Sequence, residues 1–306
     1  NNKTVPDDYP YYISHWFATS DRIDRIREML EEKQLLATED FEAMHRDVKS
    51  KKAEKITPVF VSAIKLETGL NDTEKEALKK LEEWNFELTR ESAAASVFEI
   101  LYRKVCENLI KDDLSPELFS ALKGQRSLLE NLIINIQSEK SSGWIDDKTT
   151  AETETFESIV IRSFKETIVD LTAENGEKTD DWKWGKIHTF TIGHPLGAVS
   201  VLDKAFNLNK GPFETPGSYH TVMPFSYSYN NLYKASAGAS HRHIFDVGNW
   251  DASKTVIPTG TSGIPASDFY LDQTEMYLNN QYHADPFSKN EVEKAAKFRM
   301  KLTKYP

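Results

Sequence analysis

The sequence predicts an α+β fold, because apolar residues recur at helical spacing in its first half and not in its second. Between about residues 20 and 175, apolar side chains return every three or four positions, as in Ile23, Ile26 and Leu30. Ten of the 13 glycines lie from Gly176 onward, beside short runs rich in β-branched and aromatic residues. We therefore expect a helical subdomain followed by a segment of short strands.

Two kinds of residue predict where helices start. Capping side chains accept hydrogen bonds from the N–H groups of the first turn, and acidic residues in that turn interact favourably with the helix dipole. One capping residue, Thr73, opens a Thr-x-x-Glu pattern of the capping-box form, and another precedes a proline at the first helical position. The expected caps, in chain order, are Ser20 or Thr19, Thr38, Thr73 and Ser115. A helix over Thr155–Leu171 closes the helical half.

Short β-prone runs bounded by turn residues predict the strands of the second half. The candidates are Ile187–Ile192, His243–Val247 and Thr255–Pro258. From Asn290 to Leu302 charged residues alternate with apolar ones, which predicts a terminal amphipathic helix.

Charge and hydropathy exclude two classes of partner. A net charge of −10 argues against nucleic acid, because phosphate binding needs clustered Lys and Arg. No run of about 18 apolar residues is present, so we expect no membrane-spanning helix. Asn1–Pro6 lacks a basic-then-apolar signal segment, so an export signal would lie upstream. The single Cys106 shares a helical face with Tyr102 and Leu109 and is expected to be buried and inert.

Self-contained catalytic motifs are weak. His241 and His243 would point to one face of a strand, which suggests zinc, but no His-Glu-x-x-His or Cys-x-x-Cys spacing accompanies them. Hydrogen-bonded structural histidines are the alternative. The Gly-x-Ser-x-Gly elbow is absent, although Gly260-Thr261-Ser262-Gly263 superficially resembles it. No residue type in these patterns points on its own to a reaction.

Several separate blocks in one order carry a more specific signal. They are Trp182–His188, His194–Gly197, Gly238–Arg242, Asp246–Gly248, Thr261–Ser267, Tyr270–Gln273 and Tyr282–Ser288, with Trp84–Phe86 and Arg90–Ala95 in the helical half. Together they resemble the penicillin acylase (penicillin amidase) family of N-terminal-nucleophile hydrolases, and the resemblance covers nearly the whole chain.

The resemblance implies a four-layer αββα sandwich, of which this chain would supply the C-terminal part of the large chain. Residues 1–19 would form the edge of that core and carry the oxyanion-hole segment. Residues 20–175 would be the helical subdomain, and residues 176–306 the mixed β/α part of the core. The rest of the sandwich would come from the upstream half of the same enzyme, which is the expected partner.

The resemblance also implies an activity. Members of the family hydrolyse an N-acyl amide, such as a penicillin or an acyl-homoserine lactone, to a carboxylic acid and an amine. The nucleophile is a Ser at a chain start, whose own amino group acts as base. This sequence starts with Asn1, whose carboxamide cannot act in that way. We therefore expect the nucleophile upstream, an inactive isolated chain and a periplasmic or secreted enzyme. A non-catalytic binding domain is the alternative.

Two residues match the family's catalytic positions. Asn1, which precedes Asp8-Tyr9-Pro10, matches the asparagine whose side-chain N–H stabilises the oxyanion. Arg22 matches an arginine near the substrate and the amine of the nucleophile, although Arg25 or plain solvation of the helix are alternatives. Trp16 and Phe17 would line an acyl pocket or belong to the core.

The resemblance implies no cofactor for this chain. A family calcium ligand, an aspartate just after the Tyr-Pro pair, has no counterpart because Tyr11-Tyr12-Ile13-Ser14 follows. The resemblance allows calcium only in the complete enzyme. His188, His194 and Arg242 belong to the recognised blocks and are expected to fix loops and strands by hydrogen bonds.

Overall fold

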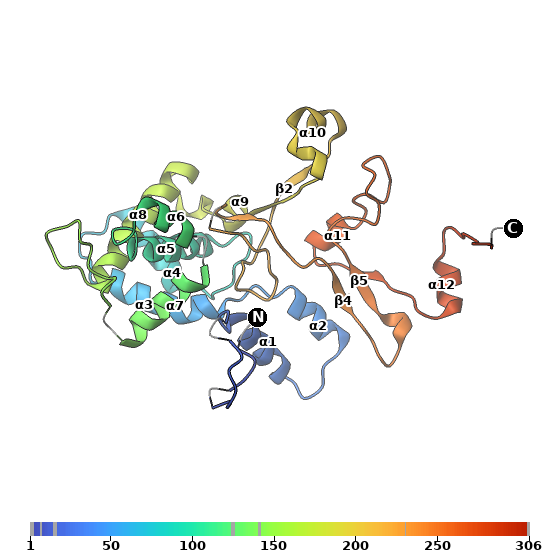
Figure 1. Ribbon diagram of the computed structural model, residues 1–306, viewed down its shortest axis with the longest axis horizontal. Coiled ribbons are helices and arrows are strands. Elements are labelled where there is room, and N and C mark those ends of the chain that lie inside the picture. Colours follow the sequence, from blue (N-terminus) through green and yellow to red (C-terminus); the bar gives the residue numbers. More distant parts are fainter. Residues whose placement is uncertain are drawn as a thin grey trace.

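The computed structural model describes residues 3–6, 8–14, 17–123, 126–139, 142–229 and 231–304. The molecule is elongated: most helices gather at one end, two small sheets follow, and the C-terminal helix stands at the other end (Figure 1). None of the helices in these ranges is long and apolar enough to cross a bilayer.

Within the described residues, eight α-helices form the first half, and shorter ones are interspersed among the strands. The first eight are α1 (Asp21–Glu31), α2 (Thr38–His45), α3 (Lys51–Ile64), α4 (Asp72–Glu82), α5 (Ala93–Asn108), α6 (Pro116–Lys123), α7 (Arg126–Glu139) and α8 (Phe156–Asn175). The later ones are α9 (Trp184–Ile187), α10 (Ser200–Phe206), α11 (Thr274–Leu278) and α12 (Lys289–Ala295), with 3₁₀ turns at Thr179–Asp181, Pro195–Ala198 and Trp250–Ala252.

Helix α5 is the centre of the helical end. Ser92 caps it by accepting a hydrogen bond from the N–H of Ala95 at 3.1 Å. Nearly all of its side chains are buried, because α4, α7, α8 and α9 pack around it. The only cysteine, Cys106, lies in this helix and is fully buried, as the sequence predicted.

The helix starts confirm some expected caps and correct others. The Ser115 Oγ accepts from the N–H of Leu118, and Thr155 caps α8, which continues to Asn175. Thr73 is not a cap: Asn71 and Glu74 form the reciprocal capping box, so α4 begins two residues earlier than expected.

Two further caps differ from the expectation. Thr38 is the first helical residue of α2 rather than its cap, and the carboxylate of Asp40 accepts from the N–H of Ala37 instead. Ser20 sits at the start of α1 in a helical conformation and donates its hydroxyl to Asp24 at 2.7 Å. Its side chain therefore does not cap the helix.

In the part of the chain that the structure describes, two three-stranded sheets follow the helices. The first has the order β2-β1-β3, and the second has the order β4-β5-β6 and is antiparallel throughout. In the first sheet β1 pairs antiparallel with β2 and parallel with β3. The strands are β1 (Thr189–Ile192), β2 (Lys210–Glu214), β3 (Lys234–Ala235), β4 (Arg242–Ile244), β5 (Lys254–Val256) and β6 (His283–Ala284).

The strands are shorter than predicted, for local reasons. β1 starts at Thr189 because the preceding residues form the helical turn α9. β4 ends at Ile244, since the Asp246 carboxylate accepts from the N–H groups of Gly248 and Asn249 and turns the chain. β5 ends at Val256 because the next N–H donates to Gln273.

Two tryptophans join the helical end to the sheets. The indole N–H of Trp182 donates to the carbonyl of Gly176, and that of Trp184 to the carbonyl of Gly217, both at 2.8 Å. Both rings are fully buried. Buried indole N–H groups need acceptors of this kind. The block that contains Trp182 and Trp184 therefore lies where the helical end meets the sheets.

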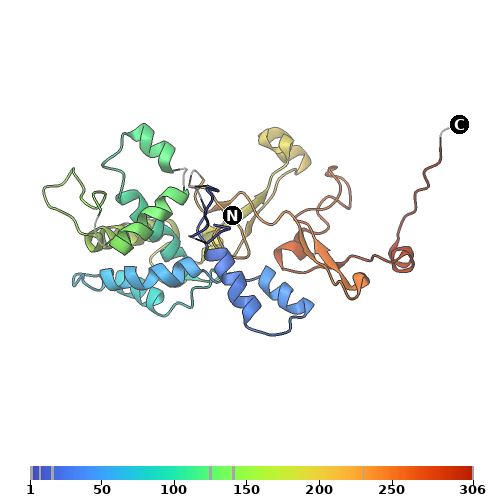
Figure 2. The same ribbon diagram turned by 60° about the horizontal axis from the view of Figure 1, so that its bottom comes forward.

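The C-terminal end projects from the rest of the molecule (Figure 2). Helix α12 stops at Ala295, seven residues before the predicted end at Leu302, because Ala296 takes an extended conformation. None of its side chains is buried, and so short a helix gains little stability without packing. Phe298, Met300 and Leu302 follow it as exposed side chains.

Candidate functional site

Arg22 lies in the first turn of α1, which packs against α3. Its side chain is partly buried, and this burial lowers the pKa of the guanidinium below its ordinary value. The Nε atom is buried and lacks a hydrogen-bond partner, and no ion pair to Arg22 occurs within the described part of the chain. Such a guanidinium is available to an anion or a developing negative charge.

Arg25, one turn further along α1, is in the opposite situation. Its Nε and Nη2 atoms donate to the carboxylate of Asp47, the shortest at 2.8 Å, and its Nη1 donates to Glu28 at 2.9 Å. These bonds raise its pKa. Arg25 therefore ties α1 to the segment before α3, and its donors are occupied.

The structure describes only one of the other residues predicted around this site. Asn1 and Trp16 lie outside the described residues. Phe17 is partly buried beside the start of α1 and belongs to no recorded core cluster. The structure therefore gives the geometry of Arg22 and not that of its expected oxyanion partner.

A buried polar chain elsewhere has the shape of a catalytic triad. The Oγ of Ser50 lies 2.8 Å from Nδ1 of His220, and Nε2 of His220 lies 2.5 Å from Oε1 of Glu99. Tyr227 donates its hydroxyl to the other carboxylate oxygen of Glu99 at 2.5 Å. All four side chains are buried, and Ser50 accepts from the N–H of Ala53 as the cap of α3. A substrate cannot reach Ser50, so this hydrogen-bonded group of side chains is structural.

None of these four residues was singled out from the sequence, and Glu99 is the one for which a signal existed. Burial alone would raise the pKa of Glu99, but the charge and hydrogen bond of His220, with the bond from Tyr227, hold it below its usual value. A carboxylate in the otherwise apolar run Val97–Leu101 was the available signal. Its partners lie more than a hundred residues away, so spacing could not reveal them.

The three residues expected to be structural make hydrogen bonds of that kind. His188 Nδ1 lies 2.9 Å from the carbonyl of Tyr233. His194 Nδ1 accepts from the N–H of Leu196, and Arg242 donates to the carbonyl of Tyr277 at 2.7 Å. The burial of His188 lowers its pKa to about 4.

The zinc alternative was tested by geometry. His241 and His243 do lie on one face, with ring centroids 4.9 Å apart. His241 contacts the hydroxyl of Thr255, and Nε2 of His243 lies 2.8 Å from the carboxylate of Asp285. Among the described residues no three His, Cys, Asp or Glu side chains converge in a way that could hold a metal ion.

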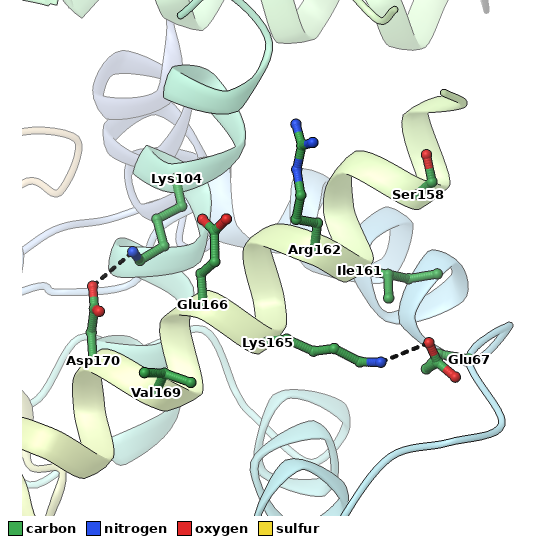
Figure 3. Close-up of a pocket in the computed structure, with 9 residues that line it drawn as sticks. All are labelled: Glu67, Lys104, Ser158, Ile161, Arg162, Lys165, Glu166, Val169 and Asp170. Atoms are coloured by element: carbon green, nitrogen blue, oxygen red, sulfur yellow. Dashed lines mark hydrogen bonds and ion pairs between the residues drawn. The ribbon is translucent and has the colours of Figure 1, made fainter. Parts of the chain in front are cut away.

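A groove of about 630 Å³ crosses the outer face of α8 (Figure 3). Lys104 pairs with Asp170 at 2.7 Å, and Lys165 pairs with Glu67 at 2.8 Å. Its remaining cation, Arg162, pairs with Asp147 outside the groove. Because charges of both signs alternate and neutralise one another, the groove has no field of one sign that would select a ligand.

Known proteins are similar to this chain over nearly its full length. The model of the family described as penicillin amidase matches residues 1–294. An acyl-homoserine lactone acylase QuiP of Pseudomonas syringae pv. syringae (strain B728a) is 25% identical over 99% of this chain and 38% of its own length. The penicillin acylase 2 proenzyme of Pseudomonas sp. (strain SE83) is 26% identical over 89% of this chain and 34% of its own.

A solved structure shows the same fold. The thermostable penicillin G acylase from Alcaligenes faecalis superposes with a TM-score of 0.59 and 14% identity, over 100% of this chain and 56% of its own. The chain thus spans well under two thirds of the length of these proteins.

Proposed function

The chain belongs to the penicillin amidase family, and on that premise we propose that it is part of an acylase that hydrolyses an N-acyl amide to a carboxylic acid and an amine. The family match across residues 1–294 is the observation that carries the proposal. The relatives named for penicillin and for acyl-homoserine lactones suggest substrates of those two kinds.

We further propose that these 306 residues are inactive without the rest of the protein. The serine of the triad-like group, Ser50, and the thiol of Cys106 are both fully buried, so neither can reach a substrate. The relatives are more than twice as long as the matched region, so they have room for a nucleophile elsewhere.

Arg22 is proposed to act on the amine of that nucleophile. A cation beside an α-amino group disfavours its protonated form, so the amine keeps a free lone pair with which to take the proton of the nucleophile. The unpaired, partly buried guanidinium of Arg22 supports this role, and the occupied donors of Arg25 argue against the alternative.

Asn1 is proposed to donate its side-chain N–H to the oxygen that becomes negative in the tetrahedral intermediate. Removal of one such donor typically lowers kcat by about 100- to 1,000-fold. In the assembled enzyme Asn1→Ala should lower kcat by this amount and change KM much less, as expected of a contact that forms in the transition state.

The test is amide hydrolysis with a panel of chromogenic N-acyl anilides, by this chain alone and by the chain co-produced with the rest of the protein. We expect activity only in the combined sample. There, Arg22→Gln should move the acidic limb of the pH–rate profile to higher pH, because the amine becomes more basic. The matched variant Arg25→Gln should lower thermal stability and leave the profile in place.

Three outcomes would contradict the proposal or one of its parts. Robust hydrolysis by the 306 residues alone would mean that the nucleophile lies within them. No hydrolysis by a folded, combined sample across the panel would favour a non-catalytic binding domain. An unchanged pH profile in Arg22→Gln, with activity retained, would remove Arg22 from the mechanism.

A further inference from the structure

A cavity of about 320 Å³ opens at the first turn of α1, the helix that carries Arg22. Its described walls come from the start of α1 and from α3, α5 and α7. Pockets for small molecules begin at about 300 Å³, so the space suits a compact ligand. Arg22 itself is not among the lining residues, and the cavity is a separate feature.

Two of the charged groups in its wall neutralise each other. Nζ of Lys52 lies 2.6 Å from the carboxylate of Glu130, and each side chain is 5% exposed. The same ammonium lies over the rings of Tyr102 and Tyr219, at 5.0 and 4.4 Å from their centroids. Lys52 is therefore committed to this pair and leaves the cavity no free positive charge.

The carboxylate of Asp21 is different. Asp21 is 6% exposed, yet the recorded cation nearest to it in the described chain is Lys55, at 3.7 Å. Lys55 is 55% exposed and also reaches Asp24, so it compensates Asp21 weakly. Lys55 lines the cavity as well, so its two carboxylates face two ammonium groups, and Asp21 is the buried carboxylate with the weaker partner.

The remaining wall has an apolar part, and the polar residues Thr19, Ser20 and Asn131 complete the described lining. Ile56 of α3 and Ile134 of α7 line the cavity together with the ring of Tyr102. A ligand that satisfies both features has one positive charge at one end and a short hydrocarbon body at the other.

We propose that this cavity binds a small primary alkylammonium ion, with its nitrogen on the Asp21 carboxylate and its chain against Ile56, Tyr102 and Ile134. The ammonium would displace Lys55, whose long side chain has solvent to turn into. The site does not depend on the proposed hydrolysis, so its test does not use activity.

Titration calorimetry of the 306-residue chain with n-pentylammonium at neutral pH tests the proposal, with 1-pentanol as the neutral ligand of similar size. We expect saturable one-to-one binding of the ammonium and binding of the alcohol that is at least about tenfold weaker. Asp21→Asn should weaken ammonium binding by about tenfold, whereas Lys55→Met should strengthen it. Glu31→Gln, an equal charge change at an exposed position of α1, should leave it unchanged.

Ile134→Trp fills the cavity without changing its charge and should abolish binding of both ligands. If Asp21→Asn fails to fold, as judged by circular dichroism, the result for Ile134→Trp still tests the proposal. Full ammonium binding in Ile134→Trp, or equal binding of pentylammonium and pentanol to the unaltered chain, would overturn the proposal. Absence of saturable binding by pentylammonium would overturn it as well.

Discussion

The buried imidazole of His188 links the stability of the fold to pH. The ring of His188 stacks on Trp184 at a centroid distance of 4.7 Å and bonds the carbonyl of Tyr233. Its Nε2 has no partner within the described residues, and burial lowers its pKa from 6.5 to about 4. His188 is therefore neutral in the folded chain at neutral pH.

This lowered pKa predicts a loss of stability in mild acid. Between pH 6.5 and about 4 the unfolded chain binds a proton at His188 and the folded chain does not, so stability falls as pH falls through this window. The full loss from this residue is about 3 kcal/mol. Urea unfolding at pH 7 and pH 5 should show a smaller pH effect in His188→Gln than in the unaltered chain.

The exposed His241 provides the control. His241→Gln should keep the full pH effect, because its ring is in water in both states. If His188→Gln and the unaltered chain lose stability in parallel between pH 7 and pH 5, other groups cause the effect.

The buried pair of Lys52 and Glu130 gives a second prediction. Lys52→Met should destabilise the chain by about 3–5 kcal/mol, because it leaves a buried carboxylate without its cation. The double variant Lys52→Met/Glu130→Leu should recover most of this loss, as measured by urea unfolding. A double variant no more stable than the single one would show that the other partners of Glu130 matter more.

An exposed ion pair of similar length serves as the comparison. Lys65 and Glu82 approach to 2.5 Å, but the lysine is 57% exposed. Lys65→Met should cost less than about 1 kcal/mol, since water solvates both charges when they separate.

At the scale of elements, the caps decide where helices begin. Asn71 and Glu74 exchange two hydrogen bonds at the start of α4, at 2.8 and 2.9 Å. Asn71→Ala should therefore lower the free energy of unfolding by about 1 kcal/mol. Glu76→Ala, at an exposed position of the same helix, is the control and should change it by less than half as much. Equal effects of the two substitutions would argue against the capping box.

Helices could be predicted from this sequence better than strands, for a physical reason. The 3.6-residue period of α5 and α8 is carried by side chains within one element, so local sequence reveals it. The strands are two to five residues long, and Asp246 or Gln273 sets their ends through bonds from outside the strand. No periodic pattern encodes such bonds.

The candidate site could be predicted only in part. Arg22 was identified by resemblance, and its unpaired state emerges only in three dimensions. The hydrogen-bonded group Ser50–His220–Glu99 joins residues up to 170 positions apart and gave no signal beyond one carboxylate in a short apolar run of α5. The cavity beside Asp21 likewise depends on four elements that the sequence does not order in space.

At the scale of the whole molecule, exposed apolar side chains gather toward the C-terminal end. Phe287 is 71% exposed, Phe298 81% and Met300 82%. Solvated aromatic and aliphatic groups in this number mark a surface that another chain segment covers. The proposal that this chain is part of a longer acylase names the remaining part of that protein as the cover.

This surface predicts how the isolated chain behaves. The chain alone should bind a hydrophobic dye such as ANS and self-associate, and the combined sample with the rest of the protein should do so less. The double variant Phe298→Ser/Met300→Ser should reduce dye fluorescence, whereas Leu66→Ser at the helical end should not. Undiminished dye binding in the combined sample would mean that this surface stays open to water.

The central helix also holds the single thiol of these 306 residues, and its position has a practical consequence. Cys106 is fully buried among α5 and its neighbours, and burial raises its pKa well above the ordinary value. A thiol reagent can therefore modify it only while the helical end is open. The rate of labelling in native buffer therefore measures how often the helical end opens locally. The labelling rate of Cys106 can be compared with and without the rest of the protein. A lower rate in the combined sample would show that assembly reduces local opening of the helical end.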